Sequence, residues 1–202
     1  RDSDSLSVTL TEKLQAIISE QEQNPFDGIL HHKEKVDLVP SNLSLSSLEM
    51  TLVTAMSRES VLKNYLSLVK DKYDYVLIDC MPSLGMITIN ALAAADSVVI
   101  PTQPHYLSAK GLELLLRSVS MVKRQINPKL RIDGILMTMV MPRTNISKEI
   151  TATVKSAYGQ KIKVFDTEIP HSIRAVEATA EGKSIFAYDK GGKVAAAYEQ
   201  FS

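Results

Sequence analysis

The stretch YDYVLIDCMPSLG, residues 73–85, decides the fold class. Its apolar run, residues 76–78, has no polar interruption, which is typical of a strand buried on both faces of a parallel sheet. The run ends at the carboxylate of Asp79, and Pro82 and Ser83 then indicate a turn and the N-cap of a helix. Open α/β sheets bind ligands at the carboxyl ends of their strands, so Asp79 is the first candidate site residue. An ordinary strand end capped by an aspartate is the alternative.

Strands and helices alternate along the rest of the chain. Apolar runs predict further strands at residues 36–39, 98–100, 132–140, 164–165 and 185–186. Apolar stripes at helical spacing predict a helix that starts at residue 4 or 5 and ends at 22, and others at residues 45–56, 61–69, 87–95, 145–158, 172–180 and 194–201. A further stripe at 112–122 predicts a long amphipathic helix that ends near Asn127 and Pro128. This alternation predicts a doubly wound α/β fold, with a mainly parallel sheet and helices on both of its faces. We expect residues 1–202 to form a single domain.

Composition narrows the class of protein. A chain of 202 residues with 45% hydrophobic content can bury a substantial core. Its 23 basic residues equal its 23 acidic residues, so any contact with nucleic acid must come from a local basic patch. The single cysteine, Cys80, excludes an intrachain disulfide and fits a reducing cytoplasm. No apolar run approaches the length of a membrane span, and we expect no membrane partner.

A phosphate-binding loop is not recognisable in these residues. Such a loop needs glycines for close backbone approach, a lysine for the phosphates and a serine or threonine for Mg²⁺. The tripeptide Gly182-Lys183-Ser184 is a poor candidate, because the first glycine of the motif would fall at Glu177. No buried strand leads into it.

The segment 78–85 resembles the Walker B and switch II region of the ParA/MinD/Soj group of deviant P-loop ATPases. The resemblance is nearest to the ParA/Soj branch and covers nearly the whole chain through segments 94–96, 98–104, 134–139, 143–145 and 169–177. It implies a P-loop NTPase-like fold whose Walker A strand, loop and helix precede residue 1. We therefore expect a sheet that is incomplete at its amino-terminal end, with a gap beside the strand at 76–78. The 202-residue chain by itself should then be catalytically inert.

The resemblance also implies an ATP site with Mg²⁺. Asp79 would be the catalytic and metal-organising residue, and Pro82, Ser83 and Gly85 would form the switch that senses the nucleotide. Thr138 and Pro170 would lie against the adenine, although simple packing is an open alternative for both.

Two arginines, Arg143 and Arg174, match positions where relatives carry surface arginines for nonspecific DNA binding, which needs only phosphate contacts. A solvated charged surface is the alternative.

The function that the resemblance implies is a ParA/Soj-like partition ATPase for a plasmid or chromosome. It would form a homodimer with ATP, bind nonspecific DNA and hydrolyse ATP when a ParB-like partner stimulates it. We expect it in the cytoplasm on the nucleoid. A MinD-like, membrane-cycling regulator of the division site is one alternative, but residues 194–202 lack its basic amphipathic tail. A non-enzymatic interaction domain that retains the fold is another.

Overall fold

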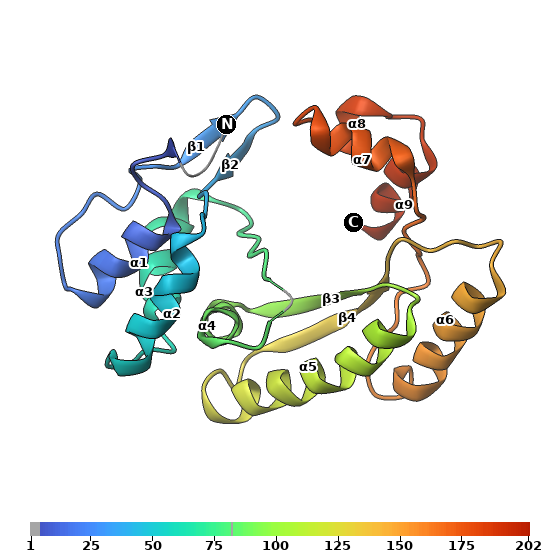
Figure 1. Cartoon of the computed structure of the whole chain (residues 1–202), viewed down its shortest axis with the longest axis horizontal. Coiled ribbons are helices and arrows are strands. Elements are labelled where there is room, and N and C mark those ends of the chain that lie inside the picture. The colour runs from blue at the N-terminus through green and yellow to red at the C-terminus, as the bar shows by residue number, and fades with distance from the viewer. Residues whose placement is uncertain (1–4, 82) are drawn as a thin grey trace. The chain divides into compact units, whose positions relative to one another are not determined.

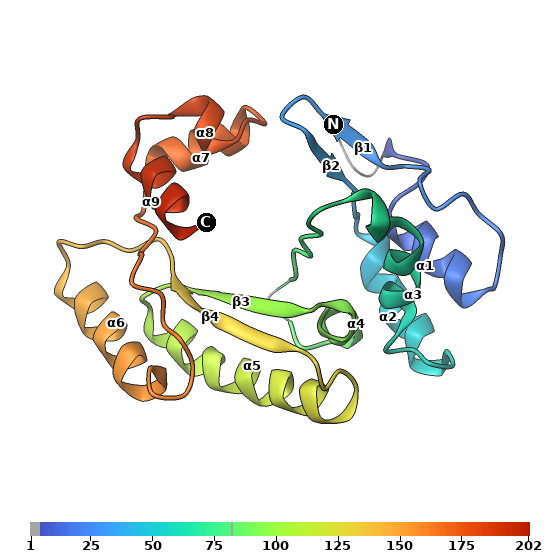
Figure 2. The same cartoon turned by 180° about the vertical axis from the view of Figure 1, so that it is seen from behind.

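The computed structural model describes residues 5–81 and 83–202, which form two compact units. Unit 1 comprises the chain up to Asp96 together with Val119–Leu130, and unit 2 comprises Ser97–Ser118 together with Arg131–Ser202. Figure 1 and Figure 2 show the elements of each unit from opposite sides. One of the points where the chain passes between the units, after Ser118, falls within the long helix α5 (Tyr106–Gln125). Within the described residues, no helix has the length and apolar character needed to cross a lipid bilayer.

Unit 1 is built mainly from helices, with one short hairpin. The helices are α1 (Leu10–Ile18), α2 (Ser44–Thr54), α3 (Val61–Val69) and α4 (Met86–Ala94), and a 3₁₀ turn, η2 (Lys70–Lys72), follows α3. The hairpin strands β1 (Leu30–His32) and β2 (Val36–Leu38) are antiparallel, with His31 opposite Asp37. A capping box starts α1, because Thr9 accepts a hydrogen bond from the Thr11 amide and Glu12 accepts one from the Thr9 amide.

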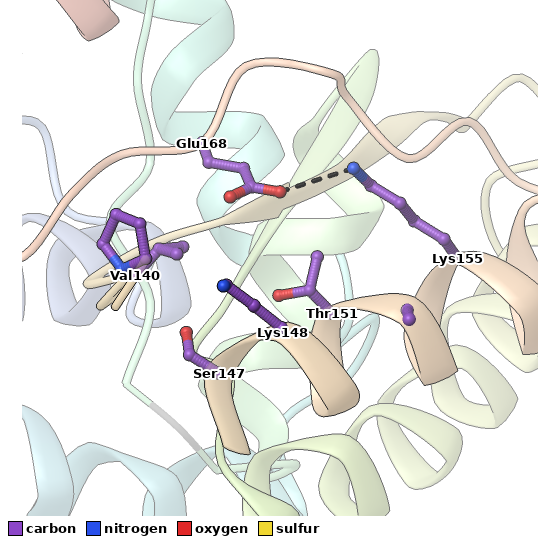
Figure 3. A pocket seen from close by; sticks show the side chains of 8 residues that line it. Val140, Ser147, Lys148, Thr151, Lys155 and Glu168 are labelled. Atoms are coloured by element: carbon purple, nitrogen blue, oxygen red, sulfur yellow. Dashed lines mark hydrogen bonds and ion pairs between the residues drawn. The ribbon is translucent and has the colours of Figure 1, made fainter. Parts of the chain in front are cut away.

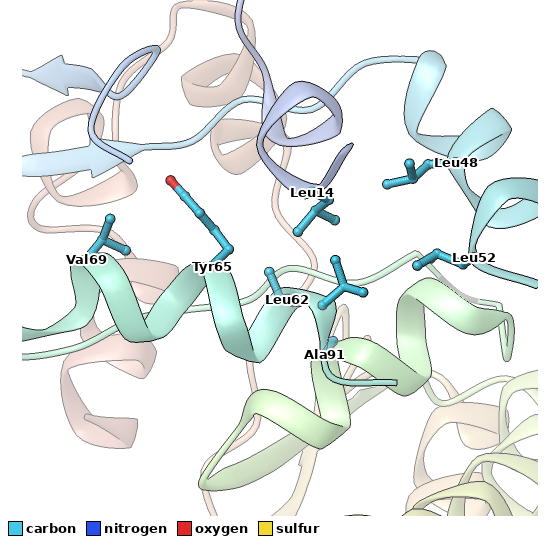
Figure 4. Packing of buried hydrophobic residues seen from close by; sticks show 8 residues of the cluster. Leu14, Leu48, Leu52, Leu62, Tyr65, Val69 and Ala91 are labelled. Carbon is cyan, nitrogen blue, oxygen red and sulfur yellow. The ribbon is translucent and has the colours of Figure 1, made fainter. Parts of the chain in front are cut away.

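The core of unit 1 lies where the four helices meet. Figure 4 shows buried side chains converging from all of them: Leu14, Leu48, Leu52, Leu62, Tyr65, Val69 and Ala91. The Tyr65 hydroxyl donates to the Pro25 carbonyl oxygen at 3.2 Å, so this buried aromatic keeps a partner for its polar end. The side chain of Asn90 on α4 is fully buried. Its oxygen accepts a hydrogen bond from the Leu62 amide in the first turn of α3, and its nitrogen donates to the Arg58 carbonyl oxygen in the loop before α3. Asn90 therefore fixes α4 against the start of α3.

Unit 2 is a parallel strand pair with helices on both faces. Strand β3 (Ser97–Thr102) pairs in parallel with β4 (Arg131–Met137). Isolated parallel bridges, Ile135 to Val164 and Val140 to Pro170, place two later segments along the other edge of β4. The helices are α5, α6 (Asn145–Tyr158), α7 (Ile173–Ala180), α8 (Ile185–Tyr188) and α9 (Lys193–Phe201).

Alternation along β4 divides its side chains between two apolar clusters. Ile135 and Met137 pack with Leu112 of α5 and Val154 of α6, and all of these side chains are buried. Leu136 points the other way and packs with Ile169 and with Val194 of α9. Successive residues of a strand face opposite sides of a sheet, so the α5/α6 layer and the α9 layer cover different faces. The predicted parallel α/β arrangement is confirmed within this unit.

The predicted strand at residues 76–78 is wrong for this structure. These residues belong to no strand, and no backbone–backbone hydrogen bond joins them to another described residue. Tyr75 is 88% exposed and Leu77 is 94% exposed, while Ile78 packs against the core of unit 1. A strand exists only through hydrogen bonds to a neighbour, and apolar composition alone cannot supply that neighbour.

Three further elements differ from prediction. Residues 185–186, predicted as a strand, lie in the short helix α8, because the Ser184 hydroxyl caps it by accepting from Ala187 N at 3.1 Å. Residues 164–165 form only an isolated bridge rather than a strand. The first helix is also shorter than the predicted 5–22, since the capping box at Thr9 fixes its start and it ends at Ile18.

Candidate functional site

Asp79 lies in unit 1, on the irregular segment that precedes α4. Its residue is exposed, and no described residue forms an ion pair or hydrogen bond with its carboxylate. Partial burial, followed by the negative charge of Asp79, raises the pKa of the neighbouring Cys80 thiol. The thiol therefore stays protonated at neutral pH, which argues against Cys80 as a nucleophile. Asp79 remains the carboxylate that is available to a ligand here.

The predicted switch residues form a small hydrogen-bonded turn at the start of α4. The Gly85 amide donates to the Ser83 hydroxyl at 3.4 Å, and the Thr88 hydroxyl donates to the Ser83 carbonyl oxygen at 2.7 Å. Gly85 is the N-cap of α4. Pro82 lies outside the described residues.

Glu49 of α2 is a residue of this site whose contacts sequence reasoning missed. Its Oε1 atom accepts a hydrogen bond from the Ile87 amide at 3.3 Å, in the first turn of α4. A Cβ atom at residue 85 would collide with Glu49 Oε1 and would come within 2.9 Å of its Cδ atom, so any larger residue there would displace the Glu49 carboxylate from its present position. A carboxylate is favoured at a helix N-terminus, where amides and the helix dipole attract negative charge. No pattern in the sequence links residues 49 and 85, and only the fold reveals the contact.

The residues of this site can be matched against the needs of Mg²⁺ and a nucleotide. The described residues contain no cluster of three or more histidine, cysteine, aspartate or glutamate side chains that would hold a metal without help. Mg²⁺ in nucleotide sites commonly binds one or two carboxylates, with phosphate oxygens and water completing the octahedron. The lone, exposed carboxylate of Asp79 fits that kind of site.

Thr138 and Pro170 lie in unit 2, at the carboxyl end of the parallel pair. The Thr138 amide donates to the Thr102 carbonyl oxygen at 2.9 Å, which continues the pairing beyond β3 and β4. Val140 bridges to Pro170, so the segments that contain Thr138 and Pro170 run side by side. Met139, between these contacts, has a φ of 52°, which is uncommon for a residue with a side chain and occurs often at binding sites. The structure thus brings the two predicted adenine residues together, and it places Asp79, Ser83 and Gly85 in the other unit.

The two predicted DNA-binding arginines differ in their surroundings. Arg143 is exposed in the loop before α6, and no described residue forms an ion pair with it. Arg174 on α7 lies 4.0 Å from the Glu177 carboxylate and 5.9 Å from the centre of the Tyr188 ring. The Tyr188 hydroxyl donates to the same carboxylate at 3.1 Å. Arg174 therefore already has intramolecular partners that a phosphate would have to replace, whereas Arg143 has none of this kind.

Comparisons with known proteins add independent information. Residues 3–132 match the family model described as an AAA domain. The sporulation initiation inhibitor protein Soj of Bacillus subtilis is 44% identical over 165 residues, covering 82% of this chain and 64% of Soj. The chromosome partitioning protein ParA of Myxococcus xanthus is 39% identical over 176 residues, covering 86% of this chain and 62% of that protein. The chain thus spans slightly less than two thirds of the length of these relatives.

A solved protein structure resembles this chain over its whole length. Cobyrinic acid a,c-diamide synthase from Mycobacterium smegmatis, solved with bound ADP and magnesium, superposes with a TM-score of 0.83 at 30% identity. The match covers 100% of this chain and 72% of that one.

Proposed function

Because the chain belongs to the ParA/Soj family of AAA-domain ATPases, we propose that it works as a partition ATPase for plasmid or chromosomal DNA. The observation that carries this proposal is the 44% identity to Soj over 82% of the chain. The proposed ligands are ATP and Mg²⁺. Two observations support these ligands: a relative has been solved with ADP and magnesium, and the carboxylate of Asp79 is exposed and has no ion-pair partner among the described residues.

Each predicted site residue has a proposed role. Asp79 holds the Mg²⁺ site through its carboxylate, and the bound ion offsets the charge that develops on the phosphates during transfer. The turn formed by Ser83 and Gly85 adjusts its hydrogen bonds when a γ-phosphate is present. Glu49 positions that segment, since its carboxylate bonds to the first turn of α4. The edge formed by Thr138 and Pro170 accepts the adenine.

The proposal extends to partners and location. With ATP the protein forms a homodimer that binds DNA without reading its sequence, through Arg143 and Arg174, in the cytoplasm on the nucleoid. A ParB-like protein then stimulates hydrolysis and releases the DNA.

The salt dependence of DNA binding tests the two arginines. Because Arg143 has no intramolecular ion pair, Arg143→Ala should lower the slope of log affinity against log salt by about 0.9 for each DNA phosphate that the variant no longer neutralises. Arg174→Ala should have a smaller effect, because Glu177 already competes for this side chain. Equal and negligible effects in both variants would refute the assignment.

The nucleotide role can be tested by Mg²⁺-dependent ATP hydrolysis in the intact protein. Asp79→Asn should reduce turnover at least about tenfold, because an amide oxygen is a much weaker ligand for Mg²⁺ than a carboxylate. Asp74→Asn is the matched control, since Asp74 is an exposed carboxylate on the same irregular segment, and it should leave turnover unchanged. Equal loss in both variants would contradict the role of Asp79. DNA binding without any hydrolysis by the unaltered protein would favour the non-enzymatic interaction domain.

A further inference from the structure

A pocket in unit 2 lies between α6 and the segments that follow β4. Its volume is about 340 Å³, and it is lined by Val140, Pro142, Ser147, Lys148, Thr151, Ala152, Lys155 and Glu168. Figure 3 shows Lys148 and Thr151 pointing from α6 toward the same space, with Glu168 across from them. A water molecule's share of liquid volume is about 30 Å³, so the pocket has room for a small molecule rather than for isolated water alone. None of the residues assigned to the ATP site lines it.

The hydroxyl of Thr151 is the unexplained group in this pocket. Thr151 is 7% exposed, and its Oγ1 atom is buried without a hydrogen-bond partner in the described structure. A threonine in a helix can donate to the carbonyl oxygen four residues earlier, as Thr153 does to Glu149 at 2.9 Å. Thr151 makes no such bond. Since buried polar groups almost always have partners, this hydroxyl is an unsatisfied donor in the wall of the pocket.

The pocket is lined by two lysines and one glutamate, so its positive charges outnumber its negative charge. Lys155 forms an ion pair with Glu168 at 3.3 Å, so these two charges offset each other. Lys148 is exposed and has no ion-pair partner within residues 5–81 and 83–202, so no protein carboxylate offsets this one positive charge on the pocket lining that also includes Thr151. The Ser147 hydroxyl is already engaged, because it accepts from the Met141 amide at 3.3 Å. An ammonium next to a hydroxyl donor favours an oxyanion, since hydrogen bonds to charged acceptors are the strong ones.

We infer that this pocket is a binding site for one oxyanion, the phosphate or carboxylate group of a small molecule. Lys148 provides the charge and Thr151 donates a hydrogen bond to an anion oxygen. Val140, Pro142 and Ala152 supply an apolar wall for the rest of the molecule. The site goes beyond the proposed ATPase role, because it contains neither Asp79 nor the predicted adenine residues.

The test is an NMR titration of the 202-residue chain with inorganic phosphate and, separately, with acetate, against sodium chloride at matched ionic strength. Saturable shifts of the Thr151 and Ala152 amide signals are expected with at least one of the two anions. Thr151→Val and Lys148→Gln should each weaken binding about tenfold or more, because each removes a bond to a charged group. Thr151→Ser keeps the hydroxyl and should retain binding. Thr153→Val is the matched control on the same helix and should bind as the unaltered chain does.

Several outcomes would overturn the inference. Shifts that do not saturate, or that chloride reproduces, would mean general charge screening. Unchanged binding by Thr151→Val would mean that the orphaned hydroxyl does not bind the anion. A saturable shift with duplex DNA alone, and none with phosphate or acetate, would assign Lys148 to a DNA surface instead of a small-molecule site. The titration needs no nucleotide, so its failure is distinct from a failure of the Asp79 experiment.

Discussion

Replacing Asn90 with alanine should destabilise unit 1 by an amount that the structure allows us to estimate. The side chain is 1% exposed and makes three hydrogen bonds: it accepts from Leu62 N at 3.1 Å and donates to Arg58 O at 2.7 Å and to Met86 O at 3.0 Å. Each bond contributes about 1 kcal/mol net, and the buried groups left without partners add to the cost. We therefore expect a loss of about 3 kcal/mol in the free energy of unfolding.

Urea unfolding followed by circular dichroism measures this loss. With a slope of about 2 kcal/mol per molar urea, the midpoint for unit 1 should fall by about 1.5 M. The matched control is Asn64→Ala, an exposed position on α3 that should change stability by less than about 0.5 kcal/mol. A loss below about 1 kcal/mol for Asn90→Ala would refute the reasoning, because it would mean that water or a small rearrangement satisfies the Leu62 amide as well as the asparagine does.

Two further perturbations probe other parts of the fold. The hydrogen bond from His31 lowers the pKa of Asp37 most, and the hydrogen bond from the Tyr73 hydroxyl lowers it further. The ionised Asp37 therefore stabilises the hairpin at any pH above the pKa that this residue has in the unfolded chain. This stability is lost as the pH falls through the lower pKa of the folded state. Amide exchange of β1 and β2 against pH should show that loss, and Asp37→Asn should abolish the dependence; an identical profile in the variant would contradict the assignment. Gly134→Ala should destabilise unit 2 by about 1–3 kcal/mol, because the added Cβ would lie 2.7 Å from Phe165 Cε2 in a backbone with φ of +157°. Thermal unfolding measures this change, and an unaltered midpoint would mean that the Phe165 ring and the Lys163 carbonyl oxygen, which would lie 2.8 Å from the added Cβ, both move aside at no cost.

Local signals in the sequence predicted much of the fold. Helix α6 runs from Asn145 to Tyr158 as predicted. Its two ends could be predicted because the residues that mark them, Thr144 and Gly159, are next to the helix in the sequence. The strands at 98–100 and 132–140 are confirmed as the parallel pair β3 and β4, with ends shifted by a few residues. The P-loop NTPase-like α/β class is confirmed by the match to a solved relative at a TM-score of 0.83.

The errors came from interactions that a local pattern does not contain. The run at 76–78 has the composition of a buried strand, yet a strand also needs a partner, and the described residues provide none. At 185–186, one capping hydroxyl outweighed a preference for strand.

Some features of the candidate site could likewise be predicted from the sequence, and others could not. The juxtaposition of Thr138 and Pro170 followed from the resemblance, and the structure brings their segments together. The contact between Glu49 and Gly85 and the orphaned hydroxyl of Thr151 involve residues that are distant in sequence or depend on one rotamer, so no periodicity could indicate them.

The exposed segment around Leu77 has a consequence for handling the protein. Tyr75 and Leu77 present apolar side chains to solvent on a stretch of backbone that no described residue pairs. Such a stretch is a template for intermolecular sheet formation, and encounters between two chains rise with the square of concentration. Concentrated samples should therefore precipitate sooner than dilute ones, and Leu77→Lys should raise the solubility limit without altering the core.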